Sequence, residues 1–297
     1  MTTRRALLIA SFLAAGLGFA PCSALRAAEE PLPVVASFSI LADLARNIGG
    51  PRVAVAALVG PDSDAHVYEP GAADGRTLAR ARLVIVNGLG FEGWMDRLIR
   101  ASKTTASVVV ASASVAPRKL EGGADPHAWQ DPGNVKIYVA NIRDALIAAD
   151  PQGAADYRTR AADYLARLDA LDAEIKAKIA AVPAGRRKIV STHDAFGYFS
   201  ARYGLEFIAP EGVSTEAEPG ARDVARIIET IKKTGAGALF LENMASPRLM
   251  RRIAAETGAK IRGSLYSDAL SAPDGPAPGY IDMMRHNVKE LTDALEH

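Results

Sequence analysis

Three histidines in distinct local motifs are the residues of this chain best suited to chemistry. His66 lies in Asp-Ala-His-Val-Tyr-Glu-Pro, His127 in Asp-Pro-His-Ala-Trp-Gln-Asp-Pro, and His193 in Ser-Thr-His-Asp-Ala-Phe. The sequence contains 5 histidines in all, and these three are flanked by small, turn-forming or acidic residues. Neutral imidazoles on separate loops are typical ligands of a transition metal. The pattern therefore indicates a metal site, provided that the fold brings the three loops together.

Strand-like and helix-like segments alternate along the chain, and this alternation predicts an α/β fold with two Rossmann-like lobes of mainly parallel strands. The expected strands cover residues 33–37, 53–58, 83–87, 108–110, 188–192, 207–208, 238–241 and 260–265. The expected helices cover residues 40–48, 71–82, 131–149, 151–181, 223–234, 247–257 and the chain from about 280 onward.

The longest expected helix runs from Pro151 to about Ala181 and spans roughly 45 Å. Its apolar residues recur at intervals of three and four, as on one helix face: Tyr157, Ala161, Tyr164, Leu168, Leu171, Ile175 and Ile179. A helix of this length predicts a rigid connection between two lobes, although a long packing helix inside a single domain is the alternative. The expected division is a signal peptide at 1–27, an N-terminal α/β lobe at 28–150, a linking helix at 151–182 and a C-terminal α/β lobe at 183–297.

The candidate residues follow the strands in a way that predicts where a ligand binds. Ligands of open parallel sheets bind beyond the carboxyl ends of the strands. His66, His193 and Asp268 come at or just after such ends, and His127 lies in a loop before a helix. Since two of the four belong to each half of the chain, a ligand that all four hold would lie in the cleft between the lobes.

The first residues of the chain have the order of a secretory signal peptide. Arg4 and Arg5 precede an apolar run at 6–20, which is too short for an ordinary membrane span. We expect cleavage near Ala24–Ala28 and export to the periplasm. Pro21 occupies the position before Cys22 where a lipoprotein signal has a small residue, which favours a soluble exported protein. A mature chain without cysteine would have to bind a metal through nitrogen and oxygen atoms.

The charge balance excludes several classes of partner. The sequence has 35 basic and 34 acidic residues, and removal of the leader with its three arginines leaves 32 basic residues. A net charge this close to zero argues against a nucleic-acid partner and against a polybasic membrane anchor. We expect a monomer.

The motifs around the candidate residues resemble those of one protein family. The segments 64–70, 125–132, 191–205 and 265–271 are similar to the four metal-ligand loops of solute-binding proteins of metal-ion ABC transporters, the zinc-uptake and manganese group of cluster A-I. Ala65 replaces a usual proline in the first loop, and Gln130 replaces a common leucine in the second. The segment 212–219 also fits the family, so the resemblance covers nearly the whole mature chain.

The resemblance implies a metal-capturing protein that is not an enzyme and that delivers its ion to an ABC-transporter permease. Carried over by position, it implies that His66, His127, His193 and Asp268 are the ligands; a helix cap is the alternative role of Asp268. Manganese-selective relatives typically have glutamate at the third position, so His193 favours zinc over manganese. A manganese- or iron-binding protein of the same family is the alternative. The loop at 116–124 has no histidine, unlike the long histidine-rich loop of many zinc-specific relatives. Both delivery by a periplasmic metallochaperone and direct capture of zinc therefore remain open.

Two other functions have weaker support in the sequence. The segment Gly88–Gly93 fits the Gly-x-Gly-x-x-Gly pattern of a dinucleotide site, but no acidic residue lies at 97–120 to bind a ribose, which favours a simple strand-to-helix turn. A zinc-dependent hydrolase is the alternative from another class, and it would need an open coordination position beside a base such as Glu216 or Glu218. Four residues could orient the imidazoles, namely Glu216, Glu218, Glu69 and Trp129. The alternative is that the glutamates are surface charges and that Trp129 packs in the core. No role is expected for His286 and His297.

Overall fold

Two four-stranded sheets form the framework of the structure, and every strand pair in them is parallel. The computed structural model describes residues 30–120, 123–217, 219–235 and 238–296, so the predicted signal peptide lies outside the described residues. The first sheet has the order β2-β1-β3-β4, with β1 Leu32–Phe38, β2 Val53–Val59, β3 Leu83–Val86 and β4 Ser107–Val110. The second has the order β10-β9-β7-β8, with β7 Lys188–Val190, β8 Glu206–Ile208, β9 Ala238–Glu242 and β10 Lys260–Leu265. The predicted α/β fold with two parallel-sheet lobes is confirmed.

Helices flank both sheets, and most of them lie where the sequence predicts. They are α1 Ser39–Gly49, α2 Ala72–Arg80, α3 Met95–Ser102, α4 Pro132–Ala149, α5 Ala154–Ala181, α6 Gly197–Tyr203, α7 Ala221–Thr234, α8 Arg248–Thr257 and α9 Tyr280–Glu296. Single 3₁₀ turns cover Gly50–Arg52, Ala128–Gln130, Pro151–Gly153 and Ala184–Arg186. The predicted strand-to-helix turn at Gly88–Gly93 leads to α3, although no bounds were predicted for that helix. The sequence did not predict α6 or a small antiparallel hairpin, β5 Lys119–Leu120 with β6 Gly123–Ala124. The helix α6 and the two hairpin strands are too short to show a clear periodic pattern of apolar residues.

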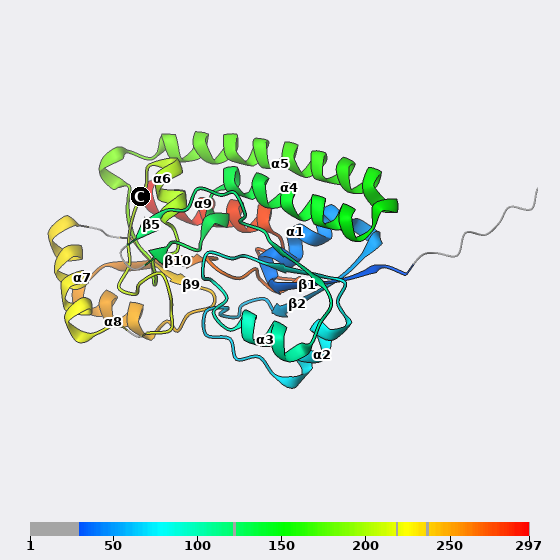
Figure 1. The fold of residues 1–297 in the computed structure, drawn as a ribbon. Helices are drawn as coiled ribbons and strands as arrows, with labels where there is room; N and C mark the ends of the chain where they lie inside the picture. Colours follow the sequence, from blue (N-terminus) through cyan, green and yellow to red (C-terminus); the bar gives the residue numbers. More distant parts are fainter. Residues whose placement is uncertain (1–29, 121–122, 218, 236–237, 297) are drawn as a thin grey trace, which may run out of the picture. The chain divides into compact units, whose positions relative to one another are not determined.

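The long helix α5 joins the two lobes. It has 28 residues, or about 42 Å of helix. One end lies beside α4 and α1, and the helix also contacts α6 and α9 of the C-terminal lobe (Figure 1). Every apolar residue assigned to its inner face from the sequence is buried. The periodic pattern therefore predicted both the helix and the face by which it packs.

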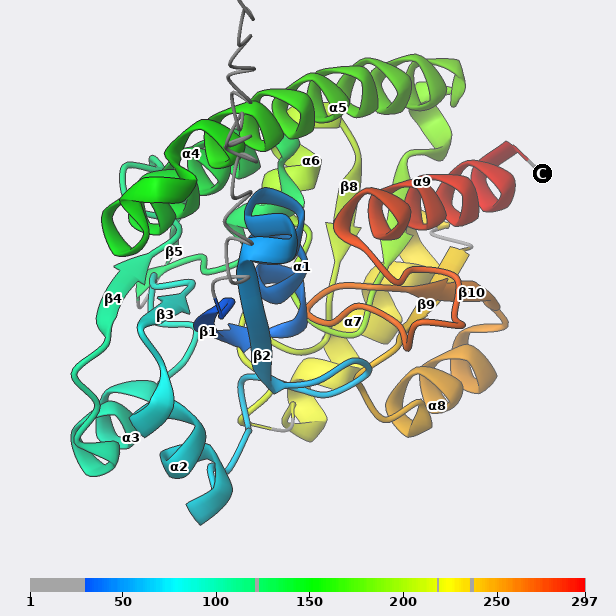
Figure 2. The ribbon, with the colours of Figure 1, turned by 90° about the vertical axis from the view of Figure 1, so that its right-hand side faces the viewer.

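A shared hydrophobic core connects the lobes beneath α5. It includes residues of β1 and α1 from the N-terminal lobe and of β7 and α9 from the C-terminal lobe, together with the inner face of α5. A smaller, separate core lies where α7 and α8 pack on the second sheet. Figure 2 shows these two helices in the C-terminal lobe. Because apolar residues of both lobes are buried together, separating the lobes as rigid bodies would expose apolar surface to water.

Asp172, on the inner face of α5, is hydrogen-bonded to two residues of α6. The Nε and Nη2 atoms of Arg202 each donate to the carboxylate of Asp172 over 2.7 Å, and the Tyr203 hydroxyl donates to the same group over 2.9 Å. These hydrogen bonds, led by those from Arg202, hold the pKa of Asp172 well below its ordinary value. Arg202 also lies 3.1 Å from Asp131, the residue that caps the first turn of α4. Arg202 therefore connects three helices.

Replacement of Arg202 by methionine is expected to lower the free energy of unfolding by about 2 kcal/mol, because the charged hydrogen bonds to Asp172 are lost while most of the packing volume stays. Urea unfolding of the metal-free protein measures the change. Arg226→Met is the control, since Arg226 forms an exposed pair with Asp223 within one helix, and such pairs contribute less than about 1 kcal/mol. Equal losses in the two variants would contradict the connecting role of Arg202.

Candidate metal site

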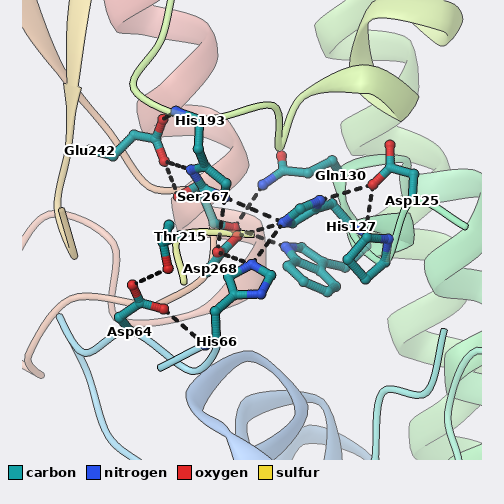
Figure 3. A network of polar contacts seen from close by, with 12 residues as sticks. Asp64, His66, Asp125, His127, Gln130, His193, Thr215, Glu242, Ser267 and Asp268 are labelled. Carbon is teal, nitrogen blue, oxygen red and sulfur yellow. Dashed lines mark hydrogen bonds and ion pairs between the residues drawn. The ribbon is translucent and has the colours of Figure 1, made fainter. Parts of the chain in front are cut away.

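The four predicted ligand residues come together between the carboxyl ends of the two sheets. His66 lies in the loop between β2 and α2, and His127 lies just before the 3₁₀ turn that leads to α4. His193 follows β7, and Asp268 follows β10. One potential ligand atom from each of the four lies within 4.8 Å of the others (Figure 3). Within the described residues, this is the one such group of three or more histidines, cysteines or carboxylates.

The spacing of the ligand atoms fits the coordination shell of one small ion. The Nε2 atom of His127 lies 3.3 Å from the Nε2 atoms of His66 and His193. The Asp268 carboxylate lies 3.3 Å from His66 Nε2, 3.5 Å from His127 Nε2 and 3.1 Å from His193 Nε2. A tetrahedral zinc shell with bonds of about 2.0–2.1 Å has edges of about 3.3–3.4 Å. These five distances, which involve both oxygens of Asp268, are close to the edge length of such a shell.

Two carboxylates behind the histidines direct their Nε2 lone pairs toward this centre. His127 Nδ1 lies 2.9 Å from Asp125 Oδ1, and His193 Nδ1 lies 2.5 Å from Glu242 Oε2. An ionised carboxylate only accepts hydrogen bonds, so each Nδ1 carries the proton and each Nε2 keeps its lone pair in the neutral ring. Converging lone pairs repel each other unless an electrophile lies between them. This arrangement of donors suits a cation.

The buried charges around the centre balance an ion of charge two. Asp268, His127 and His193 are 0% exposed, and Glu242 is 3% exposed. Asp125 is paired with Arg118, so its charge is compensated within the protein. With neutral imidazoles, the carboxylates of Asp268 and Glu242 leave about two negative charges in a dry site, which is costly without a matching cation. A divalent ion supplies the compensation.

Without a cation, the same carboxylates favour protons on the histidines. Burial alone would lower the pKa of His193, but the neighbouring Glu242 and Asp268 outweigh it and raise this pKa well above its ordinary value. The pKa of His127 is raised in the same way by Asp268 and Asp125 against the effect of burial. Burial alone would raise the pKa of Asp268, yet the two histidines hold it well below its ordinary range. Protons and metal ions therefore compete for the same site.

His66 differs from the other ligands because it lies on a loop that reaches across to the C-terminal lobe. It is the most exposed of the four, at 7%. Its backbone N–H donates to Asp64 Oδ1 over 2.8 Å, and the other oxygen of Asp64 accepts from the Thr215 hydroxyl over 2.6 Å. Two further bonds hold Asp62 in the same loop: its N–H donates to the carbonyl of Leu270, and its carboxylate accepts from Asn243.

The loop of Asp268 is held from the opposite direction by the motif that carries His127. The Trp129 indole N–H and the Gln130 amide both donate to the carbonyl of Ser267, over 2.8 and 2.7 Å. Gln130 departs from the resembled family pattern, and its amide here supplies a hydrogen bond that a leucine would not. Trp129, a candidate for orienting the imidazoles, lies beside His127 with ring centroids 5.2 Å apart. These two side chains fix the distance between the second and fourth ligand loops.

The other residues singled out in the sequence have different surroundings. Glu69 and Glu216 are exposed, and Glu218 and His297 lie outside the described residues. The orienting carboxylates are instead Asp125 and Glu242, which the sequence reading did not assign to this role. Asp125 stands two residues before His127, a spacing that could have pointed to it. His286 bonds to the carbonyl of Ser264 and takes no part in the cluster.

The glycine-rich segment forms the turn between β3 and α3, as the sequence predicts. Glu92 within the segment folds back and accepts from Ser37, from the Asn87 N–H and from the Gly88 N–H, so the turn is filled by its own carboxylate. Phe91 from the same turn packs edge-on against His66, with ring centroids 4.7 Å apart, and lies near His127. The segment therefore supports the histidine cluster, and its amides are not arranged around an open phosphate site.

Comparison with known proteins places the chain in a family. A family model described as the periplasmic zinc-uptake complex component A matches residues 34–294. The chain belongs to this family. The manganese-binding lipoprotein MntA of Halalkalibacterium halodurans is 34% identical over 97% of this chain and 96% of its own length. The iron-binding protein YfeA of Yersinia pestis is 32% identical over 87% of this chain and 84% of its own.

A solved structure agrees with the sequence relatives. The periplasmic zinc-binding protein TroA of Treponema pallidum has a TM-score of 0.85 and 31% identity, over 89% of this chain and 99% of that one. This family member is therefore the metal-binding component of an ABC transporter, which works with a membrane permease, and is not an enzyme. Since the relatives are named for manganese, iron and zinc, they do not agree on one metal. Among the described residues, no helix is long and apolar enough to cross a membrane.

Proposed function

We propose that this protein captures one zinc ion, in preference to manganese or iron, with His66, His127, His193 and Asp268. The ion is then passed to the permease of an ABC transporter for import. The observation that supports this most directly is the convergence of three Nε2 lone pairs and one carboxylate at distances of 3.1 to 3.5 Å. The ion is the cargo of the protein and not a resident cofactor.

The donor set is the argument for zinc. Zinc is borderline-soft, accepts imidazole readily and is held by about four ligands in closed sites. Manganese prefers oxygen ligands and about six of them in an octahedral shell. Here nitrogen outnumbers oxygen, and the aromatic ring of Phe91 closes one side of the cluster. A manganese ion would leave part of its preferred shell unfilled at this site.

Capture begins with the loss of the hydration shell of the ion as the four side chains replace its water. The Nδ1 protons of His127 and His193 stay on the rings and face the carboxylates behind them, so the rings need no reorientation to bind. Protons held on Nε2 must leave when the ion enters. The shared core and α5 restrict hinge motion, so we expect the bound and free states to differ mainly in loops.

The same proposal includes the export of the protein and its oligomeric state. Residues 1–27 act as a cleaved signal peptide, and the mature protein is a soluble periplasmic monomer. Mass spectrometry of the exported protein identifies its first residue, and sedimentation gives its mass in solution. An acylated Cys22 at the N-terminus would contradict the soluble form.

Competition between metals tests the proposed cargo. We expect the purified mature protein, dialysed against equal concentrations of zinc and manganese, to retain close to one zinc ion per chain and little manganese. Elemental analysis by mass spectrometry measures both, and iron(II) is tested separately without oxygen. His286→Ala is the control, because this histidine lies outside the cluster and should leave the zinc content unchanged. Retention of manganese in place of zinc would contradict the proposed preference but not the site.

A further inference from the structure

Glu242 occupies a position from which it reaches two metal-ligand loops. It is the last residue of β9, and β9 lies between β10 and β7 in the second sheet. His193 follows β7, and Asp268 follows β10. A side chain at the carboxyl end of the strand between them therefore lies between the third and fourth ligand loops, as Figure 3 shows.

Each oxygen of the Glu242 carboxylate lies close to two polar groups. Oε1 accepts from the backbone N–H groups of Thr192 and His193, over 2.8 and 2.9 Å. Oε2 accepts from the Ser267 hydroxyl over 2.6 Å and lies 2.5 Å from His193 Nδ1. One carboxylate thus fixes the backbone of His193, lies against its ring nitrogen, and also binds the residue before Asp268.

The charge of Glu242 distinguishes it from the carboxylate behind His127. Asp125 shares its charge with Arg118, whereas in the described ranges no lysine or arginine forms an ion pair with Glu242. An uncompensated carboxylate at 2.5 Å attracts the Nδ1 proton more strongly and makes the opposite nitrogen a better electron donor. The effect on metal affinity should therefore be larger for Glu242 than for Asp125.

We propose that Glu242 is the positioning residue of this site, which fixes the Nδ1–H tautomer of His193 and holds His193 and Asp268 as one preassembled pair of ligands. The inference rests on the proposed metal capture and names the residue that sets its strength. Glu242 does not contact the ion. It acts by keeping the Nε2 lone pair of His193 free and aimed at the centre.

Glu242→Gln separates this role from simple packing. Glutamine has the same shape, and its carbonyl oxygen still accepts from Thr192 and His193. Its NH₂ group then faces His193 Nδ1, which must become an acceptor and shift the proton to Nε2, the atom that would bind the metal. We expect zinc affinity to fall about 10- to 100-fold, as is usual when such a partner is lost. Competition with a fluorescent chelator measures the affinity.

The tautomer itself is the second readout. Nitrogen-15 spectra of the metal-free wild type, recorded at a pH where the ring is neutral, should show the His193 proton on Nδ1, and spectra of the metal-free variant should show it on Nε2. Glu174→Gln is the matched control, since Glu174 pairs with Arg285 and Lys178 away from the site. Ser267→Ala removes one bond to Glu242 without changing the tautomer, so its affinity loss should be smaller.

The outcomes distinguish the two proposals. Wild-type affinity in Glu242→Gln, or an Nε2–H tautomer in the metal-free wild type at that pH, would overturn the role of Glu242. The wild-type spectrum decides the question even if the variant does not fold. If the wild type binds no metal, or if His193→Ala binds zinc as well as the wild type, the proposed function is wrong instead.

Discussion

Alanine at position 268 is expected to lower the affinity for zinc by about 1000-fold, or about 4 kcal/mol. Asp268 supplies the one oxygen of the site and the charge nearest to the three Nε2 atoms, at 3.1 to 3.5 Å. Loss of one partner of a fully buried ion pair typically costs about 3–5 kcal/mol. Three histidines would still bind zinc, but with one ligand fewer and with less of its charge balanced.

Isothermal titration or chelator competition gives the affinity, and the thermal shift caused by zinc provides a second measure, because stabilisation grows with the ratio of ligand to dissociation constant. Asp274→Ala is the matched control, since Asp274 is an exposed aspartate a few residues along the same segment. A variant at position 268 that binds zinc like the wild type would show that Asp268 is not a ligand, and the alternative role as a helix cap would then have to be reconsidered.

Acidification should weaken zinc binding strongly. The ligand nitrogens must be unprotonated, and the buried carboxylates raise the pKa values of His193 and His127. A raised pKa means that protons still compete with zinc above the ordinary range of histidine, and that this competition disappears only as the pH rises past the raised values. We expect a loss of at least about 100-fold between about pH 8 and about pH 5.5.

Chelator competition at a series of pH values measures the dependence. Below the raised pKa values, each displaced proton adds up to about one unit to the slope of log affinity against pH. His193→Ala should therefore bind more weakly and show a slope that is smaller by up to about one. Equal affinity at both ends of the range would contradict ligation by histidine.

The sequence was sufficient to predict most of the elements and the grouping of the four candidate ligands for a physical reason. The inner face of α5 and the apolar strands are periodic over many residues, so burial leaves a readable pattern in them. Each histidine stands in a contiguous motif, and parallel strands bring their carboxyl ends to one edge. The convergence of His66, His127, His193 and Asp268 follows from that topology.

The residues that hold the candidate ligands in place could not be predicted from the sequence in the same way. Glu242 ends an ordinary strand, and its partners are Thr192, His193 and Ser267, which only the order of strands in the second sheet brings near. Glu69 and Glu216 lie close to the motifs in sequence, yet both side chains are exposed. Residues that are close in the sequence can be recognised as a motif. Contacts between strands can be predicted only when the order and register of the strands are known.

The loop that carries His66 has a consequence for the timing of delivery. Asp62 and Asp64 hold it to the C-terminal lobe through Asn243, Leu270 and Thr215, and none of these three touches a ligand atom of the cluster. His66 is also the most exposed of the four candidate ligands, so we expect the ion to enter and leave where this loop lies. We therefore expect substitutions of Asp62 and Asp64 to change the rate at which the ion is released more than they change the choice of metal. A protein built in this way can change how fast it hands over its cargo while leaving unchanged which cargo it selects.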